Sequence, residues 1–275
     1  MSGSLRYKLF AAIAIFLLEA GTASAADITW DGGGSTNFWS DSLNWSGNVL
    51  PTASDNVRFD STSTKNSTAD ISFAIGSLSI SSAYSGQVNV ASSFTVSGAS
   101  TIDGKIHFNS GILATLGAVS ISSSGMFTGQ SDFYYRNGVN VSNGTWSMDG
   151  AGSEVRFAAG SLVDINGLSF VEFIGGNVAG QELTMRNDTG SPTQWIIDVD
   201  NVASLTVLRV SLAQSGAGGT AAPLVAYDSI DASGNSNWNF MNSASPVPEP
   251  EVYSMLGLGL GLMGWAGRRR KPQAT

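Results

Sequence analysis

SLSISSAYSGQVNVASSFTVSGASTIDGKIHF, residues 77–108, is the stretch that decides the fold class of this chain. Four runs within it alternate apolar and polar residues: SLSI at 77–80, QVNV at 87–90, FTV at 94–96 and KIHF at 105–108. A period of two is typical of strands that bury one face. Turn-forming pairs such as Ser97-Gly98 and Asp103-Gly104 separate the runs. The stretch therefore predicts short β-strands joined by tight turns.

The same alternation continues to about residue 174, with AVSI at 118–121, GVNV at 138–141, EVRF at 154–157 and LVDI at 162–165. Strands recur at intervals of roughly 8 to 16 residues, and no window shows the 3.6-residue period of a helix. We expect an all-β fold, either a β-solenoid or a β-sandwich. The many runs of three or four residues favour a right-handed parallel β-solenoid, since a sandwich needs longer strands.

Composition narrows the functional classes. Residues 27–247 contain seven basic and eighteen acidic residues, a net charge of −11, so we expect no binding to nucleic acid. The absence of cysteine from the sequence excludes disulfides and thiolate chemistry. Charged residues make up only 12% of the chain, about half the usual share. We expect no cofactor and no metal.

The N-terminus has the pattern of a secretory signal peptide. Arg6 and Lys8 precede the apolar run LFAAIAIFLL at 9–18, and the small residues Ala23 and Ala25 predict cleavage before Ala26. Ten apolar residues span about 15 Å of helix, too short to cross a ~30 Å bilayer core. Residues 1–25 are therefore predicted to direct export through the Sec and signal peptidase machinery.

The C-terminus combines a proline-rich motif with a short apolar span. Pro248, Glu249 and Pro250 precede the uncharged stretch VYSMLGLGLGLMGWAG at 252–267. A basic cluster follows directly: Arg268, Arg269, Arg270 and Lys271. Sixteen residues make about 24 Å of helix, near the lower limit for a membrane span. The positive-inside rule then predicts a cytoplasmic tail and an exported core.

These three elements in this order resemble the PEP-CTERM sorting signal of Gram-negative bacteria. The resemblance is confined to the C-terminal part of the chain, from the VPEPE motif to the basic cluster. It implies an exosortase as the processing partner, with Pro248, Glu249 and Pro250 as the recognition tripeptide. It also implies a transmembrane sorting helix that anchors the chain transiently in the inner membrane, with residues 268–271 as the stop-transfer cluster. The final location is then the cell surface or the extracellular matrix.

A tryptophan-rich segment precedes the repetitive strands. It contains ITWDGGG at 28–34, NFWS at 37–40 and LNWS at 43–46, and it resembles the N-terminal motif of surface proteins with autotransporter-associated β-strand repeats. Trp30, Trp39 and Trp45 are candidate sugar-stacking residues, since aromatic rings pack on sugar faces. We favour the other interpretation, in which the three rings plug the end of the stack.

The expected organisation has five parts. They are a signal peptide (1–25), a tryptophan-rich capping segment (26–70), the repetitive strands (71–206), a closing module (207–244) and the sorting signal (245–275). In the closing module, Trp238 and Phe240 are predicted to cover the open end of the stack.

The sequence offers few residues for catalysis. His107 is its only histidine and alternates with Ile106 and Phe108, so we expect it on a strand surface, and one histidine without cysteine excludes a zinc site. Carboxylates such as Asp198-Asp200 and Asp228-Asp231 match no calcium-loop pattern, and solvated surface carboxylates are the simpler interpretation. A carboxylate pair for glycoside hydrolysis stays open. A lyase cleft needs clustered Lys and Arg, whereas the basic residues here are scattered along the sequence.

The sequence therefore predicts a non-catalytic, exported structural or adhesive protein, associated with a biofilm or exopolysaccharide matrix. A carbohydrate-binding surface protein that uses the N-terminal tryptophans is the alternative, and a glycan-active enzyme is the third hypothesis.

Overall fold

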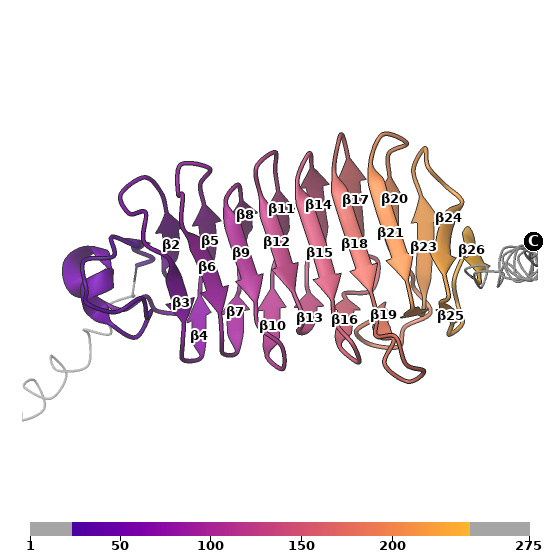
Figure 1. Ribbon diagram of the computed structural model, residues 1–275, viewed down its shortest axis with the longest axis horizontal. Helices are drawn as coiled ribbons and strands as arrows, with labels where there is room; N and C mark the ends of the chain where they lie inside the picture. The colour runs from indigo at the N-terminus through magenta and orange to yellow at the C-terminus, as the bar shows by residue number, and fades with distance from the viewer. Residues whose placement is uncertain (1–23, 243–275) are drawn as a thin grey trace, which may run out of the picture. The chain divides into compact units, whose positions relative to one another are not determined.

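A computed structural model describes residues 24–242, and these form one compact unit up to Met241. The unit is a stack of short strands, with the N-terminal residues at one end and the last strands at the other (Figure 1). Each coil of the chain contributes one strand to each of three parallel sheets. The predicted all-β parallel solenoid is thus confirmed for the described residues, while its right-handed winding stays a prediction.

Sheet 1 has nine strands, and its first strand comes from the N-terminal segment. They are β1 (Asp27–Thr29), β2 (Asn56–Phe59), β5 (Ser77–Ile80), β8 (Ser100–Ile102), β11 (Val119–Ile121), β14 (Val139–Ser142), β17 (Leu162–Asn166), β20 (Trp195–Val199) and β23 (Ser215–Gly218).

Sheet 2 also has nine strands and ends with the last strand of the described chain. They are β3 (Ser67–Ala69), β6 (Gln87–Val90), β9 (Lys105–Phe108), β12 (Met126–Gly129), β15 (Thr145–Asp149), β18 (Phe170–Ile174), β21 (Ser204–Leu208), β24 (Leu224–Tyr227) and β26 (Trp238–Met241).

Sheet 3 has eight strands, one for each complete coil. They are β4 (Phe73–Ile75), β7 (Phe94–Val96), β10 (Leu113–Leu116), β13 (Asp132–Tyr135), β16 (Glu154–Phe157), β19 (Leu183–Asn187), β22 (Val210–Leu212) and β25 (Ile230–Asp231).

The strand register excludes the β-sandwich alternative. All pairings between named strands are parallel, whereas a sandwich is built from antiparallel strands. The coils differ in length. The longest sequence separation between paired residues of neighbouring strands in sheet 1 is the one from β17 to β20, where Ile165 pairs with Val199. The extra residues of this coil lie in loops 175–182 and 188–194, on either side of β19.

The core consists of stacked columns of apolar side chains. Along most strands, residues alternate between buried and partly exposed, because successive side chains of a strand point to opposite faces. One column in sheet 1 is formed entirely by partners in register: Phe59, Ile80, Ile102, Ile121, Val141, Ile165 and Val199. Full burial of each such side chain contributes about 1.5–3 kcal/mol, so the columns stabilise every coil on its neighbours.

The N-terminal end is closed by a cap that precedes the first coil. In it, β1 pairs with β2, and two 3-10 helices follow, η1 (Ser42–Asn44) and η2 (Ser46–Asn48). The Asp41 side chain caps η1 by accepting a hydrogen bond from the Leu43 backbone N–H. The cap ends earlier than the predicted segment 26–70, because the first coil begins at Asn56.

The C-terminal end continues the same stack beyond the predicted boundary at residue 207. Strands β22 to β25 complete the last coils, and β26 adds one more parallel strand to sheet 2. Trp238 and Phe240 are half-buried and pack against the core, in agreement with the covering role predicted for them. Within residues 24–242, no helix is long and apolar enough to cross a membrane.

Candidate functional site

The three tryptophans of the cap are buried inside it. Trp30, Trp39 and Trp45 each have 0% exposed surface. The Trp45 ring stands edge-on to the other two, with centroid distances of 5.1 Å to Trp30 and 5.0 Å to Trp39. Both of those rings stack on Phe59 of the first coil. A ring without exposed surface cannot stack on a sugar, so the sugar-stacking interpretation is wrong and the rings act as the plug.

Polar side chains buried in the cap explain why these rings adopt one arrangement. Asn44 is fully buried; its amide donates to the carbonyls of Thr36 (3.0 Å) and Phe38 (2.9 Å) and its oxygen accepts from the Gly34 N–H (3.0 Å). The Trp45 indole N–H donates to the Trp39 carbonyl at 2.8 Å. Buried groups with satisfied hydrogen bonds fix a unique loop conformation.

A buried carboxylate lies where the cap joins the first coil. Asp55 is 6% exposed and accepts hydrogen bonds from the backbone N–H groups of Ala26 (2.9 Å) and Thr52 (2.7 Å). The Thr52 hydroxyl also donates to it, at 2.6 Å. This hydroxyl bond, with the backbone bonds, lowers the pKa of Asp55 below its usual value despite burial. Asp55 therefore stays ionised at neutral pH.

The outer face of sheet 1 carries a shallow trough, an open depression of about 360 Å³ across β8, β11, β14 and β17. One side of it is apolar or small: Ala99 and Ala118 are exposed, Gly138 has no side chain, and the half-exposed Leu162 borders the depression. Gly138 is required there, because a Cβ atom would lie 2.4 Å from the Leu162 carbonyl oxygen and φ is +86°.

The other side of the trough is a row of polar side chains from four successive coils. Thr101, Ser120, Asn140 and Asp164 are partners in register and face solvent. Adjacent strands are about 4.8 Å apart, so these groups repeat at that spacing along the stack. The Asn140 amide donates to the Asp164 carboxylate at 2.9 Å, which orients both groups. The trough thus offers a linear array of hydrogen-bonding groups beside an apolar strip.

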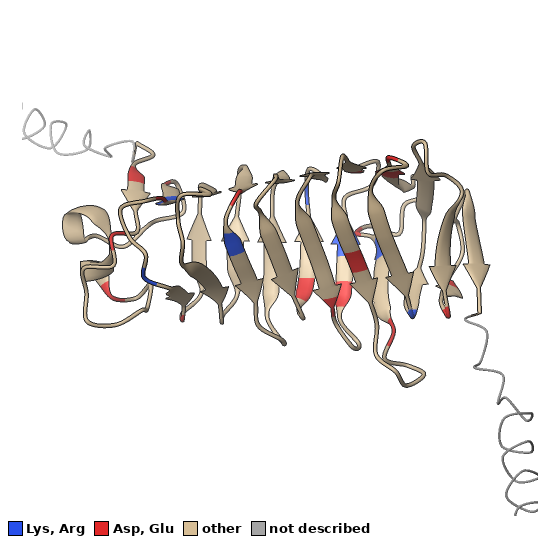
Figure 2. Cartoon of the chain, turned by 45° about the horizontal axis from the view of Figure 1, so that its top comes forward, with Lys and Arg blue, Asp and Glu red and all other residues tan. Residues whose placement is uncertain are grey.

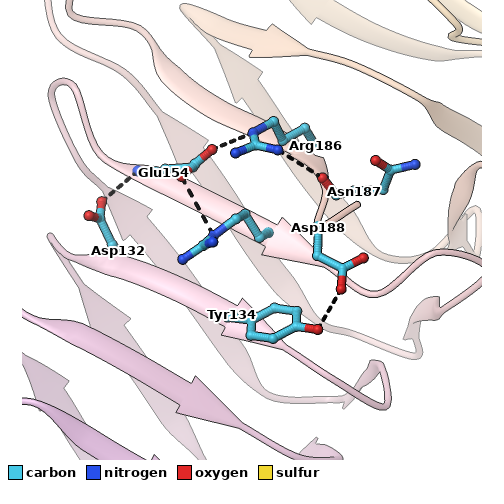
Figure 3. Close-up of polar contacts among 7 residues, drawn as sticks. Asp132, Tyr134, Glu154, Arg186, Asn187 and Asp188 are labelled. Carbon is cyan, nitrogen blue, oxygen red and sulfur yellow. Dashed lines mark hydrogen bonds and ion pairs between the residues drawn. The ribbon is translucent and has the colours of Figure 1, made fainter. Parts of the chain in front are cut away.

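The outer face of sheet 3 carries a charged network (Figure 3). Glu154 on β16 forms ion pairs with Arg156 (3.5 Å) and, in closer contact, with Arg186 on β19. The Tyr134 hydroxyl donates to Asp188 at 2.5 Å, and this bond raises the pKa of Tyr134. The network therefore ties together three neighbouring coils.

Arginine side chains also cover the Tyr134 ring of this network. The guanidinium carbons of Arg136 and Arg156 each lie 5.6 Å from the ring centroid. Three of the seven basic residues of segment 27–247 thus meet on one face, which corrects the expectation that they are scattered. Register brings them together, although they lie on different coils and far apart in the sequence. Asp132, Glu154 and Asp188 balance their charge, so the face presents no surplus of positive charge to an acidic polymer.

The only histidine of the sequence, a candidate for catalysis or metal binding, lies on the surface of the stack. His107 faces outward from β9, as predicted, and its Nδ1 lies 2.8 Å from the Thr128 hydroxyl on β12. Figure 2 shows that charged residues are sparse along the stack. Among residues 24–242, no group of three or more His, Asp or Glu side chains has an arrangement that would hold a metal ion.

Most residues predicted for targeting lie outside the described range. This applies to Ala23, to the tripeptide Pro248, Glu249 and Pro250, and to the basic cluster of residues 268–271. The predicted signal peptide and sorting helix fall there as well. Ala25 and Ala26 are described, and both are exposed at the start of the cap.

Comparison with known proteins identifies the C-terminal signal. Residues 246–271 match the model of the PEP-CTERM protein-sorting motif. No curated protein and no solved structure matches the chain, so the resemblance of its N-terminal segment to repeat-containing surface proteins stays a prediction. The motif marks the chain as an exported protein that is anchored transiently in a membrane and processed by an exosortase.

Proposed function

We propose that this chain is a non-catalytic structural or adhesive protein of the cell surface or extracellular matrix, released to its final location by exosortase processing. The observation that carries the proposal is the PEP-CTERM motif at residues 246–271, on the same chain as a parallel solenoid. A stack of coils presents long, regular outer faces, which suit contacts with extended polymers or with other matrix components.

The outer faces support a structural role more than a catalytic one. Their polar residues are mainly Ser, Thr and Asn, and charged residues are sparse along the stack. The network on sheet 3 is occupied by its own ion pairs. We expect incubation of the host's exopolysaccharide with the protein to release no new reducing ends and no unsaturated products.

The sorting motif provides the test of this proposal. We would replace Pro248, Glu249 and Pro250 together by alanine and follow both chains in their host by cell fractionation. Wild type is expected in the surface or matrix fraction, and the variant in the inner membrane at full length. A matched control replaces Pro272 and Gln273, beyond the matched residues, and is expected to behave as wild type. Equal distribution of all three chains would contradict the proposal.

A carbohydrate-binding role is the second candidate, and the trough on sheet 1 favours it. Sugar rings combine apolar C–H faces with hydroxyl edges, and the trough places exposed alanines beside Thr101, Ser120 and Asn140. Its single charged residue, Asp164, is acidic, so we propose a neutral, hydroxyl-rich glycan that runs along the stack.

Filling the trough tests this second role. Ala118→Trp places a large ring in the depression at an exposed position, and Ala74→Trp makes the same change at an exposed position of β4. We expect binding to a panel of neutral oligosaccharides, measured by calorimetry, to be lost in Ala118→Trp only. Any detergent in the sample should lack a sugar headgroup, because such a headgroup would compete with the oligosaccharides. Retained binding in Ala118→Trp would exclude the trough as the site.

A further inference from the structure

Asp55 is a buried anion that lacks a basic side chain as partner. It is the one acidic or basic residue among the buried residues of segment 24–242. The ion pairs of that segment involve Asp27 and Glu154 instead. An ionised carboxylate away from water is costly unless hydrogen bonds and an opposite charge compensate it. Three hydrogen bonds compensate Asp55 in part, one of them from the backbone nitrogen of Ala26.

The sequence predicts signal peptidase cleavage between Ala25 and Ala26. We propose that this cleavage supplies the missing positive charge, so that the new α-ammonium group of Ala26 forms an ion pair with Asp55 and locks the cap onto the first coil. The inference does not rest on the proposed function, because it concerns the N-terminus alone.

The chemistry of the step is the hydrolysis of one peptide bond. Water adds across the Ala25–Ala26 bond, the carbonyl carbon of Ala25 takes the hydroxyl group, and the nitrogen of Ala26 takes a hydrogen. The resulting amine binds a further proton at neutral pH, since α-amino groups have pKa values of about 7.7–8.0. The nitrogen of Ala26 already lies 2.9 Å from Oδ1 of Asp55, so the new positive charge forms within hydrogen-bonding distance of the carboxylate.

Neighbouring contacts hold Ala26 at this place independently of the new charge. Its carbonyl accepts a hydrogen bond from the Asn56 N–H at 2.7 Å, and β1, which starts at the next residue, pairs with β2 in register. Ala25 and Ala26 are both exposed, so the bond between them is accessible to a protease. Cleavage therefore frees the terminus without requiring the cap to rearrange.

The lock has a structural consequence for the edge of sheet 1. Strand β1 is the first strand of that sheet and covers β2, which otherwise would present an unpaired edge. Strand β1 is only three residues long, so contacts at its ends decide how firmly it is held. An ion pair directly before Asp27 would keep it in place in the processed chain.

The titration of the N-terminal amine tests the proposal. The chain that lacks only residues 1–25 would be treated with ¹³C-formaldehyde and a mild reductant at a series of pH values. NMR would then measure how much of the N-terminal amine is dimethylated at each pH, because only the unprotonated amine reacts. We expect the N-terminal residue to be Ala26 and its pKa to lie about one unit above the ordinary range, a tenfold change in proton affinity. Asp55→Asn, which keeps an oxygen acceptor for Ala26, is expected to return the pKa to that range.

A matched control is Asp60→Asn, which removes an acidic residue of the same end that accepts a hydrogen bond from Thr62 and should leave the pKa of the N-terminal amine raised. If Asp55→Asn does not fold, the wild-type amine in denaturant replaces it, and the raised pKa should disappear on unfolding. An N-terminus at another residue, or an amine in folded wild type with an ordinary pKa, would overturn the proposal.

Discussion

The two ends of the stack are closed in different ways. At the N-terminal end, three tryptophans with no exposed surface pack among aromatic residues of the first coils, and a buried asparagine fixes the loop around them. At the C-terminal end, the last strand of the described residues is β26, an additional strand whose Trp238 and Phe240 are half-buried. One end is sealed by a folded module, and the other by a single strand laid on the last coil.

This difference indicates where the stack is held and where it opens. In repeat structures each coil contacts only its neighbours, so the terminal coils gain stability from one side alone. A cap restores the missing contacts at the N-terminal end. At the C-terminal end, within the described residues, no strand pairs with the outer edge of β26. We therefore expect local opening to begin at β26 and β25, with the N-terminal end opening last.

The largest effect is expected from Trp39→Ala. This ring contacts Trp45, Phe59, Phe73 and Phe94, and its loss leaves a cavity at the junction of cap and core. We expect a loss of about 3–5 kcal/mol in the free energy of unfolding, measured with denaturant. Its neighbour Phe38 is 47% exposed, and Phe38→Ala should have little effect. A loss below about 1 kcal/mol for Trp39→Ala would show that the cap does not stabilise the stack.

A smaller effect is expected from Asn44→Ala. The change leaves the carbonyls of Thr36 and Phe38 and the Gly34 N–H without their partner inside the cap. We expect a loss of about 2–3 kcal/mol, because buried polar groups without hydrogen bonds are costly. The exposed Asn37 is the control, and Asn37→Ala should change stability by less than about 0.5 kcal/mol. Equal effects of the two changes would contradict a specific role for the buried amide.

Trp238→Ala is expected to act at the other end and more weakly. Its ring is only half-buried, so we expect a loss of about 1–2 kcal/mol. Hydrogen exchange measured by mass spectrometry should become faster for peptides from β24 and β26 and stay unchanged for peptides from β2 and β5. Faster exchange at both ends would mean that the stack opens as one cooperative unit, and the distinction between its ends would not hold.

The smallest effect is expected on the pH dependence of stability, through Asp55 at the N-terminal end of the stack. Hydrogen bonds lower the folded-state pKa of Asp55, so its contribution is present above the unfolded value of about 3.9 and is lost as the pH falls through the folded value. One such group changes stability by at most about 1.4 kcal/mol per pH unit. We expect unfolding measured between pH 2 and pH 5 to depend less steeply on pH in Asp55→Asn than in wild type. Identical slopes would contradict a lowered pKa of Asp55 in the folded state.

The period of two in the sequence was sufficient to predict individual strands. The runs at 77–80, 87–90, 94–96 and 105–108 coincide with β5, β6, β7 and β9, because alternation reports which face of a strand is buried. The pattern carries no information about which strands become neighbours. Coil length is not constant along the stack, so neither the arginines around Tyr134 nor the row from Thr101 to Asp164 could be predicted from spacing.

The cap shows a second limit of prediction from sequence. As residue types, its tryptophans suit both a sugar-binding surface and the buried plug that the sequence favoured, and their complete burial against Phe59 decides for the plug. The sequence did not predict the burial of Asp55, since that burial depends on β1 and Thr52 meeting around it. The sorting signal was predictable because a peptide motif, an apolar span and a basic cluster are read as linear sequence.

The most direct test of the central claim is the intact mass of the wild-type protein recovered from outside its host's cells. We expect a chain that begins at Ala26 and lacks the residues that follow the PEP motif, with the solenoid intact between the two cuts. A full-length C-terminus, found only in the inner membrane, would contradict the claim that this solenoid is an exported protein released by an exosortase.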